Sequence, residues 1–116
     1  MQYLCLVYGE ESVLHGMTQQ ESDELTRRSL EYDEALARAG SLIVAQALMP
    51  VRTAKTVRVR KNKVATTDGP FAETKEQLLG FVMIEANDEA QALEIAAGIP
   101  LAKIGSVEVR AVMDLD

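Results

Sequence analysis

Aromatic residues, cysteine and histidine are scarce in this chain, which has three Tyr, two Phe, no Trp, one Cys and one His among 116 residues. Few aromatic rings leave little for base stacking, and a formal net charge of −6 repels a phosphate backbone, so we expect no nucleic-acid partner. The lone Cys5 cannot form an intrachain disulfide, and we therefore expect a reduced, cytoplasmic setting. A buried strand thiol of this kind is also a poor nucleophile.

Recurrent ligand patterns are missing as well. His15 is the only histidine, and no set of His, Cys or carboxylate ligands is visible near it, so we expect no metal site. Neither Gly-x-Gly-x-x-Gly nor Gly-Lys-Ser/Thr occurs, which leaves a nucleotide unsupported, and we expect no cofactor.

Long apolar runs are also absent. No run approaches the roughly 20 residues of a membrane span, and no basic-then-apolar signal opens the chain, so we expect no membrane contact. With 47% hydrophobic residues, the composition is that of an ordinary folded protein, and residues 1–116 predict a single domain.

The first part of the chain predicts a strand followed by a helix. Residues 3–8 are apolar on both alternating faces, as in a strand that is covered on both sides. After a loop over 13–17, Thr18 and Glu21 have the spacing of a capping box that begins a helix, and Gly40 ends it. The residues at helical spacing on its inward face are Leu25, Ser29, Tyr32, Leu36 and Ala39.

The middle of the chain predicts a second strand and a hairpin. Residues 41–48 are mostly apolar, and 56–60 and 63–67 alternate as half-exposed strands do. Lys61-Asn62 joins the two strands, and Asn tolerates the positive φ of a two-residue turn. This register places two cross-strand pairs on opposite faces of the hairpin: Val59 with Val64, and Arg58 with Ala65.

The last part predicts a strand, a helix and a final strand. Residues 79–86 are again apolar on both faces, and Asn87 is the expected N-cap of a helix that Gly98 and Pro100 end. The expected inward residues of this helix are Ala90, Leu93, Ala96 and Ala97. One side of the final strand is expected to carry Val107, Val109, Ala111 and Met113.

The element order is β-α-β-hairpin-β-α-β, the split βαβ pattern of an α+β fold. In that topology the strands 3–8 and 79–86 lie at the centre, and both helices cover the same face of the sheet. Because the central strands are apolar on the other face too, a lone subunit would expose a large apolar surface. We therefore expect a homodimer in which a second copy covers this face.

The stretch Asp68-Gly69-Pro70-Phe71-Ala72-Glu73-Thr74-Lys75-Glu76 gathers turn residues, an aromatic ring and four charges. With Leu78-Leu79-Gly80-Phe81, Val107-Glu108-Val109-Arg110 and the opening Tyr3-Leu4-Cys5-Leu6-Val7-Tyr8-Gly9, it resembles the YCII-related family, in the subgroup named for its DGPF motif. The likeness covers nearly the whole chain. It implies a ferredoxin-like βαββαβ unit with an inserted β-hairpin that pairs into a dimeric α/β barrel, in a subgroup whose members mostly lack an assigned activity.

The wider family is associated with a proposed His–Asp catalytic pair whose His belongs to the first helix. This chain has no His between Thr18 and Gly40, so the pair is not carried over. His15 lies in the predicted loop, where it is either a solvated residue or a general base.

Asp68 and Glu73 are the candidate acid–base residues. Asp68 either holds the turn through its side chain or points a carboxylate into a cleft between the subunits. Glu73 belongs to a charged run with Lys75 and Glu76, which is either a solvated or subunit-contact segment or a ligand site held over the cleft mouth. Phe71 is a candidate anchor of that segment.

The remaining candidates lie on strands. Tyr8 ends a central strand and could donate a hydrogen bond into a pocket, although a Tyr at this place is commonly a core residue with its hydroxyl at the rim. Arg58, Arg60 and Arg110 could form an anion site, but each alternates with valine, which favours a solvated outer face.

Two functions fit these observations. The first is a small cofactor-free protein that binds a small polar molecule at the dimer interface, with acid–base chemistry of the lyase, isomerase or hydrolase kind. The second is a non-catalytic dimeric module that regulates or assembles with another protein. A concave pocket of about 300 Å³ or more with convergent polar groups would favour the first.

Overall fold

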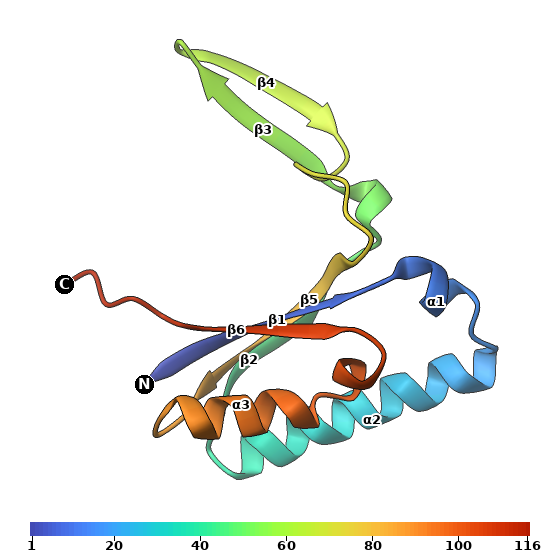
Figure 1. Ribbon diagram of the computed structural model, residues 1–116, viewed down its shortest axis with the longest axis vertical. Helices are drawn as coiled ribbons and strands as arrows, with labels where there is room; N and C mark the ends of the chain where they lie inside the picture. The colour runs from blue at the N-terminus through green and yellow to red at the C-terminus, as the bar shows by residue number, and fades with distance from the viewer.

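The computed structural model describes all of residues 1–116, which form a mixed α+β structure with antiparallel sheets. Its main sheet has four strands in the order β2-β5-β1-β6 (Figure 1). The bounds of these strands are β1 Gln2–Gly9, β2 Leu42–Ala47, β5 Gln77–Glu85 and β6 Ser106–Ala111. As predicted, the two central strands are β1 and β5, and the arrangement is consistent with a ferredoxin-like fold.

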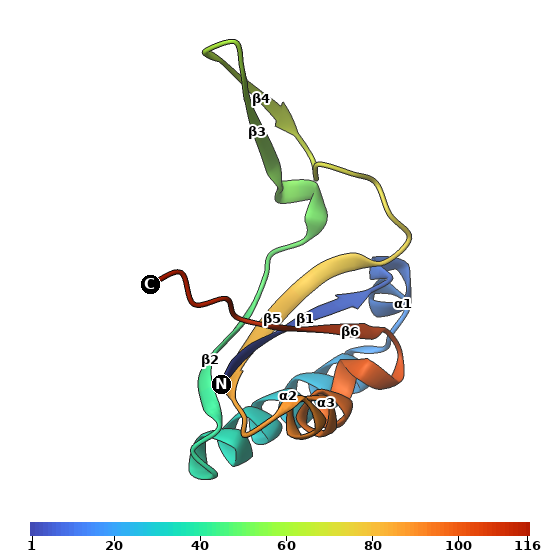
Figure 2. The same ribbon diagram turned by 60° about the vertical axis from the view of Figure 1, so that its left-hand side comes forward.

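The helices lie together on one side of this sheet, as Figures 1 and 2 show from two directions. The two main helices are α2 (Gln19–Arg38) and α3 (Glu89–Gly98). There are also three short helical turns: α1 (Glu11–His15), η2 (Pro100–Lys103) and η1 (Val51–Thr53), of which η1 lies at the base of the β3–β4 hairpin (Figure 1). No helix is both long enough and apolar enough to span a bilayer.

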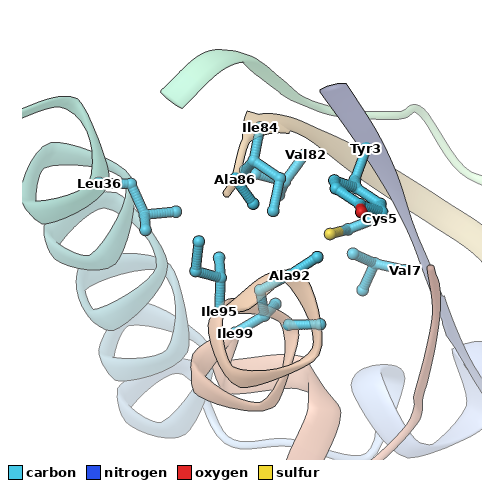
Figure 3. Packing of buried hydrophobic residues seen from close by; sticks show 11 residues of the cluster. Tyr3, Cys5, Val7, Leu36, Val82, Ile84, Ala86, Ala92, Ile95 and Ile99 are labelled. Carbon is cyan, nitrogen blue, oxygen red and sulfur yellow. The ribbon is translucent and has the colours of Figure 1, made fainter. Parts of the chain in front are cut away.

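The core fills the space between the sheet and the helices (Figure 3). Cys5 and Ile84 are completely buried, because alternate residues of β1 and β5 point toward α3. Burial also raises the pKa of the Cys5 thiol, so this cysteine is a packing residue. The eleven core residues are Tyr3, Cys5, Val7, Leu36, Val82, Ile84, Ala86, Ala92, Ile95, Ala96 and Ile99.

The other face of the sheet carries apolar side chains that are only partly buried in the single chain. Leu4 pairs with Met83 and Leu6 with Phe81 across β1 and β5, and all four are half-buried. We call this surface, centred on these two pairs, the open face. On β6 it is bordered by an ion pair whose Arg110 Nε lies 2.5 Å from the Glu108 carboxylate.

A second sheet consists of the β3 (Lys55–Arg60) and β4 (Lys63–Asp68) hairpin alone. It projects away from the main sheet on the side opposite to the helices (Figure 1). The radius of gyration is accordingly 16.0 Å, whereas a compact domain of this length has about 13 Å. The predicted register is confirmed, with Val59 paired to Val64, and Lys61 and Asn62 both have positive φ.

The first main helix is confirmed in detail. Thr18 and Glu21 form both hydrogen bonds of the capping box, and Gly40 follows the helix with φ +78°. Of the predicted inward residues, Leu36 is buried and Leu25, Ser29 and Tyr32 are half-buried. Ala39 is exposed because it is the C-cap, beyond the last turn that meets the core.

Four local predictions were wrong. The segment after β1 is not all loop, because residues 11–15 close one helical turn with His15 as its last residue. The N-cap of α3 is Asp88, whose carboxylate accepts the Gln91 backbone N–H at 2.8 Å. The buried residues of α3 are Ala92, Ile95 and Ala96, so Ala96 alone of the predicted inward residues is confirmed, while Ala90, Leu93 and Ala97 are exposed. Met113 lies beyond the end of β6 and is also exposed.

Candidate functional site

A cleft lies on the helix side, between α1, α2 and the end of the sheet formed by β2 and β5. Its volume is about 590 Å³. The cleft exists because α2 meets the core mainly through its C-terminal half, where Leu36 is buried. Toward the N-terminal half, Leu25 and Ser29 stay half-buried along the cleft wall.

A polar stripe runs along the wall that α2 contributes. Ser22, Thr26, Ser29 and Asp33 follow one another at intervals of four, three and four residues, and all four line the cleft. This spacing places them on one strip of a helix, beside the apolar strip of Leu25, Tyr32 and Leu36. Apolar side chains make up most of the remaining lining, including Leu14, Met17, Leu48, Leu79 and Leu101.

Asp33 is the charged member of this stripe. It is half-buried, and the loss of solvent around it raises the pKa of its carboxyl. Its neighbour Tyr32 donates its phenolic hydrogen to the Ile95 carbonyl at 2.6 Å, which ties α2 to α3 at the inner end of the cleft. Burial is also the main cause that raises the pKa of Tyr32, so this hydroxyl acts as a neutral donor.

The opposite end of the cleft is formed by α1. Glu11 accepts the Val51 backbone N–H at 2.9 Å and so holds α1 against η1. His15 ends α1, is exposed to solvent and lines the same cleft as Asp33. Histidine is the side chain that most readily takes up and releases a proton near neutral pH. The cleft therefore combines an apolar interior with an imidazole and a carboxyl on its walls.

His15, which the sequence left as either a solvated residue or a general base, lines this cleft. None of the six predicted site residues does, namely Tyr8, Asp68, Phe71, Glu73, Lys75 and Glu76. Asp68 ends β4, and its carboxylate lies 2.5 Å from the Lys55 ammonium with most of its side chain in solvent. Phe71 is 81% exposed, and its carbonyl accepts a 3.4 Å hydrogen bond from the Arg58 guanidinium. Glu73 lies in the exposed connection between β4 and β5.

Three of the six come together at the end of β1. The Lys75 ammonium lies 3.6 Å from the Glu10 carboxylate, just after that strand. Glu76 accepts a hydrogen bond from the Ser106 hydroxyl at 2.8 Å, and Ser106 pairs with Tyr8 across β1 and β6. Within one chain these groups form contacts between elements, and a cleft at this place would need a second subunit to close it.

The residues that sequence reasoning missed are those of the polar stripe. Ser29 was predicted to face inward, but Ser22, Thr26 and Asp33 were not recognised as part of the same strip. The available signal was that three hydroxyl side chains and Asp33 share one strip of α2, whereas the solvated strip Arg27, Glu31, Glu34 and Arg38 is fully charged. No group of three or more His, Cys, Asp or Glu side chains could hold a metal ion.

Comparison with known proteins assigns a family. The sequence model of the family described as the YCII-related domain matches residues 1–116. An uncharacterised protein of Rhizobium meliloti (strain 1021) is 37% identical over 112 residues, which are 95% of this chain and 90% of that protein. The match is to the YCII-related domain as a whole, and membership of the DGPF subgroup stays a prediction.

Proposed function

We propose that this chain, which belongs to the YCII-related family, binds a small molecule in the cleft between α1, α2 and the β2–β5 end of the sheet. The observation that carries the proposal is the polar stripe of α2, which faces a largely apolar cleft of about 590 Å³. Ligand sites of folded proteins have volumes of roughly 300–1,000 Å³, with apolar walls and a few polar groups that fix orientation.

The walls indicate the chemistry of the ligand. Glu11 and Asp33 are the acidic lining residues, and the chain has a net charge of −6, so an anion would be repelled. Ser22, Thr26 and Ser29 offer hydroxyl groups that both donate and accept hydrogen bonds. We therefore infer a neutral or cationic molecule with an apolar body and a hydroxyl or amine that meets the stripe.

Acid–base chemistry is the reaction type that the cleft supports. His15 carries an imidazole, a side chain that serves as a base in many enzymes, and burial raises the pKa of the Asp33 carboxyl. In this proposal His15 is the catalytic base and Asp33 orients the polar group of the substrate. A substrate that reaches both groups could undergo a proton-transfer step of the lyase or isomerase kind, and a hydrolytic step would need a water molecule as the nucleophile in addition.

The test is a thermal-shift and NMR screen of neutral and cationic metabolites, repeated with Asp33→Asn and with Glu34→Gln as the matched control. Glu34 is the next residue of α2, is exposed and does not line the cleft. We expect hits to weaken about tenfold with Asp33→Asn and to be unchanged with Glu34→Gln. His15→Gln should abolish turnover of any hit that reacts while leaving its binding within about threefold. Hits that are equally strong in all variants would contradict the proposal.

A second candidate site follows from the cluster at the end of β1, where Tyr8, Lys75 and Glu76 come together. We propose that the open face is covered by a second copy, which would place this cluster, with Asp68, Phe71 and Glu73, near the subunit boundary. Ligand binding that weakens in Asp68→Asn or Glu73→Gln, and not in Asp33→Asn, would favour this site. No hits at all would favour the non-catalytic dimeric module.

A further inference from the structure

The β3–β4 hairpin is an incomplete sheet. Its two strands pair only with each other, so both outer edges of the hairpin offer unpaired backbone groups. An isolated two-stranded hairpin is marginally stable in water, and an open edge is a template for a further strand. Figure 1 shows that no helix or loop of the same chain lies over the projecting part of the hairpin. Something outside the chain has to complete it.

The two faces of the hairpin differ in chemistry. Val57, Val59 and Val64 lie on one face and are 61%, 56% and 70% exposed. The opposite face carries basic side chains, namely Arg58, Arg60 and Lys63. Residues 51–67 contain six basic and no acidic residues, whereas the rest of the chain has six basic and eighteen acidic residues, a net charge of −12. The segment 51–67, which contains the hairpin, is therefore positively charged, whereas the rest of the chain is negatively charged.

The segment that follows β6 has the complementary pattern. In residues 112–116 the apolar Met113 and Leu115 alternate with Asp114 and Asp116. Met113 and Leu115 are 76% and 86% exposed, and the segment is tied to the sheet only where Val112 N–H donates to the Gln2 carbonyl at 2.9 Å. In an extended chain, alternate residues point to opposite faces, so residues 113–116 have one apolar and one acidic face, with Val112 on the acidic side where the segment leaves the sheet.

We propose that residues 112–116 of one copy add as a third strand along β3 of a second copy. The added strand would place Met113 and Leu115 on the valine face, beside Val57 and Val59. It would place Asp114 and Asp116 on the basic face, beside Arg58 and Arg60. Strand addition of this kind takes its affinity from main-chain hydrogen bonds and its specificity from alternate side chains. Cross-strand pairs of opposite charge add to both.

The contact is between copies because of where the two segments lie. β6 runs antiparallel to β1 and ends beside Tyr3, whereas the hairpin leads into β5 at Gln77, which pairs with Gly9 at the other end of β1. The five residues 112–116 span roughly 17 Å when extended. This is about the length of β1 between Tyr3, beside which β6 ends, and Gly9, beside which the hairpin leads into β5. Within one chain the segment is therefore too short to pair with β3. Two open faces related by a twofold axis perpendicular to the strands bring each segment to the partner's hairpin. The inference thus rests on the proposed dimer.

Charge exchange tests the contact. Arg58→Asp with Arg60→Asp, and separately Asp114→Arg with Asp116→Arg, should each raise the dimer dissociation constant at low salt about tenfold or more. Combining all four substitutions in one chain should return it to within about threefold of the natural protein, because the pairs are re-formed with exchanged signs. Arg38→Asp with Lys103→Asp is the control, since it changes the net charge as Arg58→Asp with Arg60→Asp does but on exposed residues of the helix layer. It should stay within about twofold.

Cysteine cross-linking gives the second readout. In a Cys5→Ser background, Val59→Cys should form an intermolecular disulfide with Leu115→Cys if the added strand is parallel to β3, or with Met113→Cys if it is antiparallel. Ala65→Cys, on the other strand and the opposite face, should form neither. A dimer that shows neither charge rescue nor a cross-link from Val59 to residues 112–116 would contradict the proposed third strand but not the proposed dimer. A monomer would overturn both. Loss of ligand binding alone would bear on the cleft and not on this contact.

Discussion

The two faces of the central sheet reach different states within the same chain, although the same strands form both. On the helix face, Cys5 and Ile84 are completely buried beneath α3. On the open face, Leu6 and Phe81, each one position along from a buried residue, stay partly exposed. A strand that is apolar on both sides needs a packed layer on each side, and within one chain only the helix layer is present. One face is therefore closed within the chain, and we propose that the other is closed by association with a second copy.

The largest effect of a substitution on stability is expected on the helix face of the central sheet. Ile84→Ala should lower the free energy of unfolding by about 3 kcal/mol, because it removes methyl groups and leaves a cavity under α3. Urea denaturation at several protein concentrations measures this loss, and the loss should be the same at each concentration. Leu93→Ala, at a half-exposed position of α3, should cost less than about 1 kcal/mol. Equal losses for the two variants would contradict the difference in burial.

The next effect concerns the open face. Leu6→Gln should raise the dimer dissociation constant about tenfold or more, because it puts an amide at the centre of the surface that the second copy covers. Sedimentation velocity measures it, with circular dichroism to verify that the fold is kept. Leu93→Gln makes the same substitution in the helix layer and should leave association unchanged. If both variants associate as the natural protein does, the open face is not the interface.

The smallest effect is expected at the cleft, where the helix face is least complete. Burial raises the pKa of the Asp33 carboxyl above its unfolded value of 3.8. At pH values between the two pKa values, this carboxyl is therefore protonated in the folded protein and ionised in the unfolded chain. The contribution of this group to stability therefore falls as the pH rises from about 3.8 through the raised pKa. Asp33→Asn should stabilise the protein by less than about 1 kcal/mol at pH 7, because solvent screens a half-exposed carboxyl.

The stabilisation of Asp33→Asn should shrink toward acidic pH, where the natural side chain is protonated in both states. Urea denaturation across that range, with Glu34→Gln as the exposed neighbour, gives the measurement. A difference that grows on acidification would show that Asp33 is held as a carboxylate.

Much of the fold was predictable from the sequence because local signals agree with the tertiary structure. The capping box at Thr18 and the Lys61-Asn62 turn are local, and both are present as predicted. Doubly apolar strands identified β1 and β5 as central. The orientation of α3 was missed because alanines lie on both its buried and its exposed sides, so the apolar pattern of this helix does not single out one face.

The cleft could not be predicted, for a physical reason. It arises from how far α2 stands from the sheet, which depends on packing between residues distant in sequence, such as Tyr32 and Ile95. The residues predicted from the DGPF stretch, such as Glu73, are exposed in the single chain. Asp33 carried a usable signal only as a member of a regular polar strip, since a single carboxylate on a helix is ordinary.

The central claim is that one copy of this chain is structurally incomplete, and the sedimentation of the natural protein tests it most directly. Over a dilution series through the micromolar range, we predict a single boundary at the mass of two chains that gives way to one chain only on further dilution. A well-folded species with the mass of one chain throughout that range would contradict the claim.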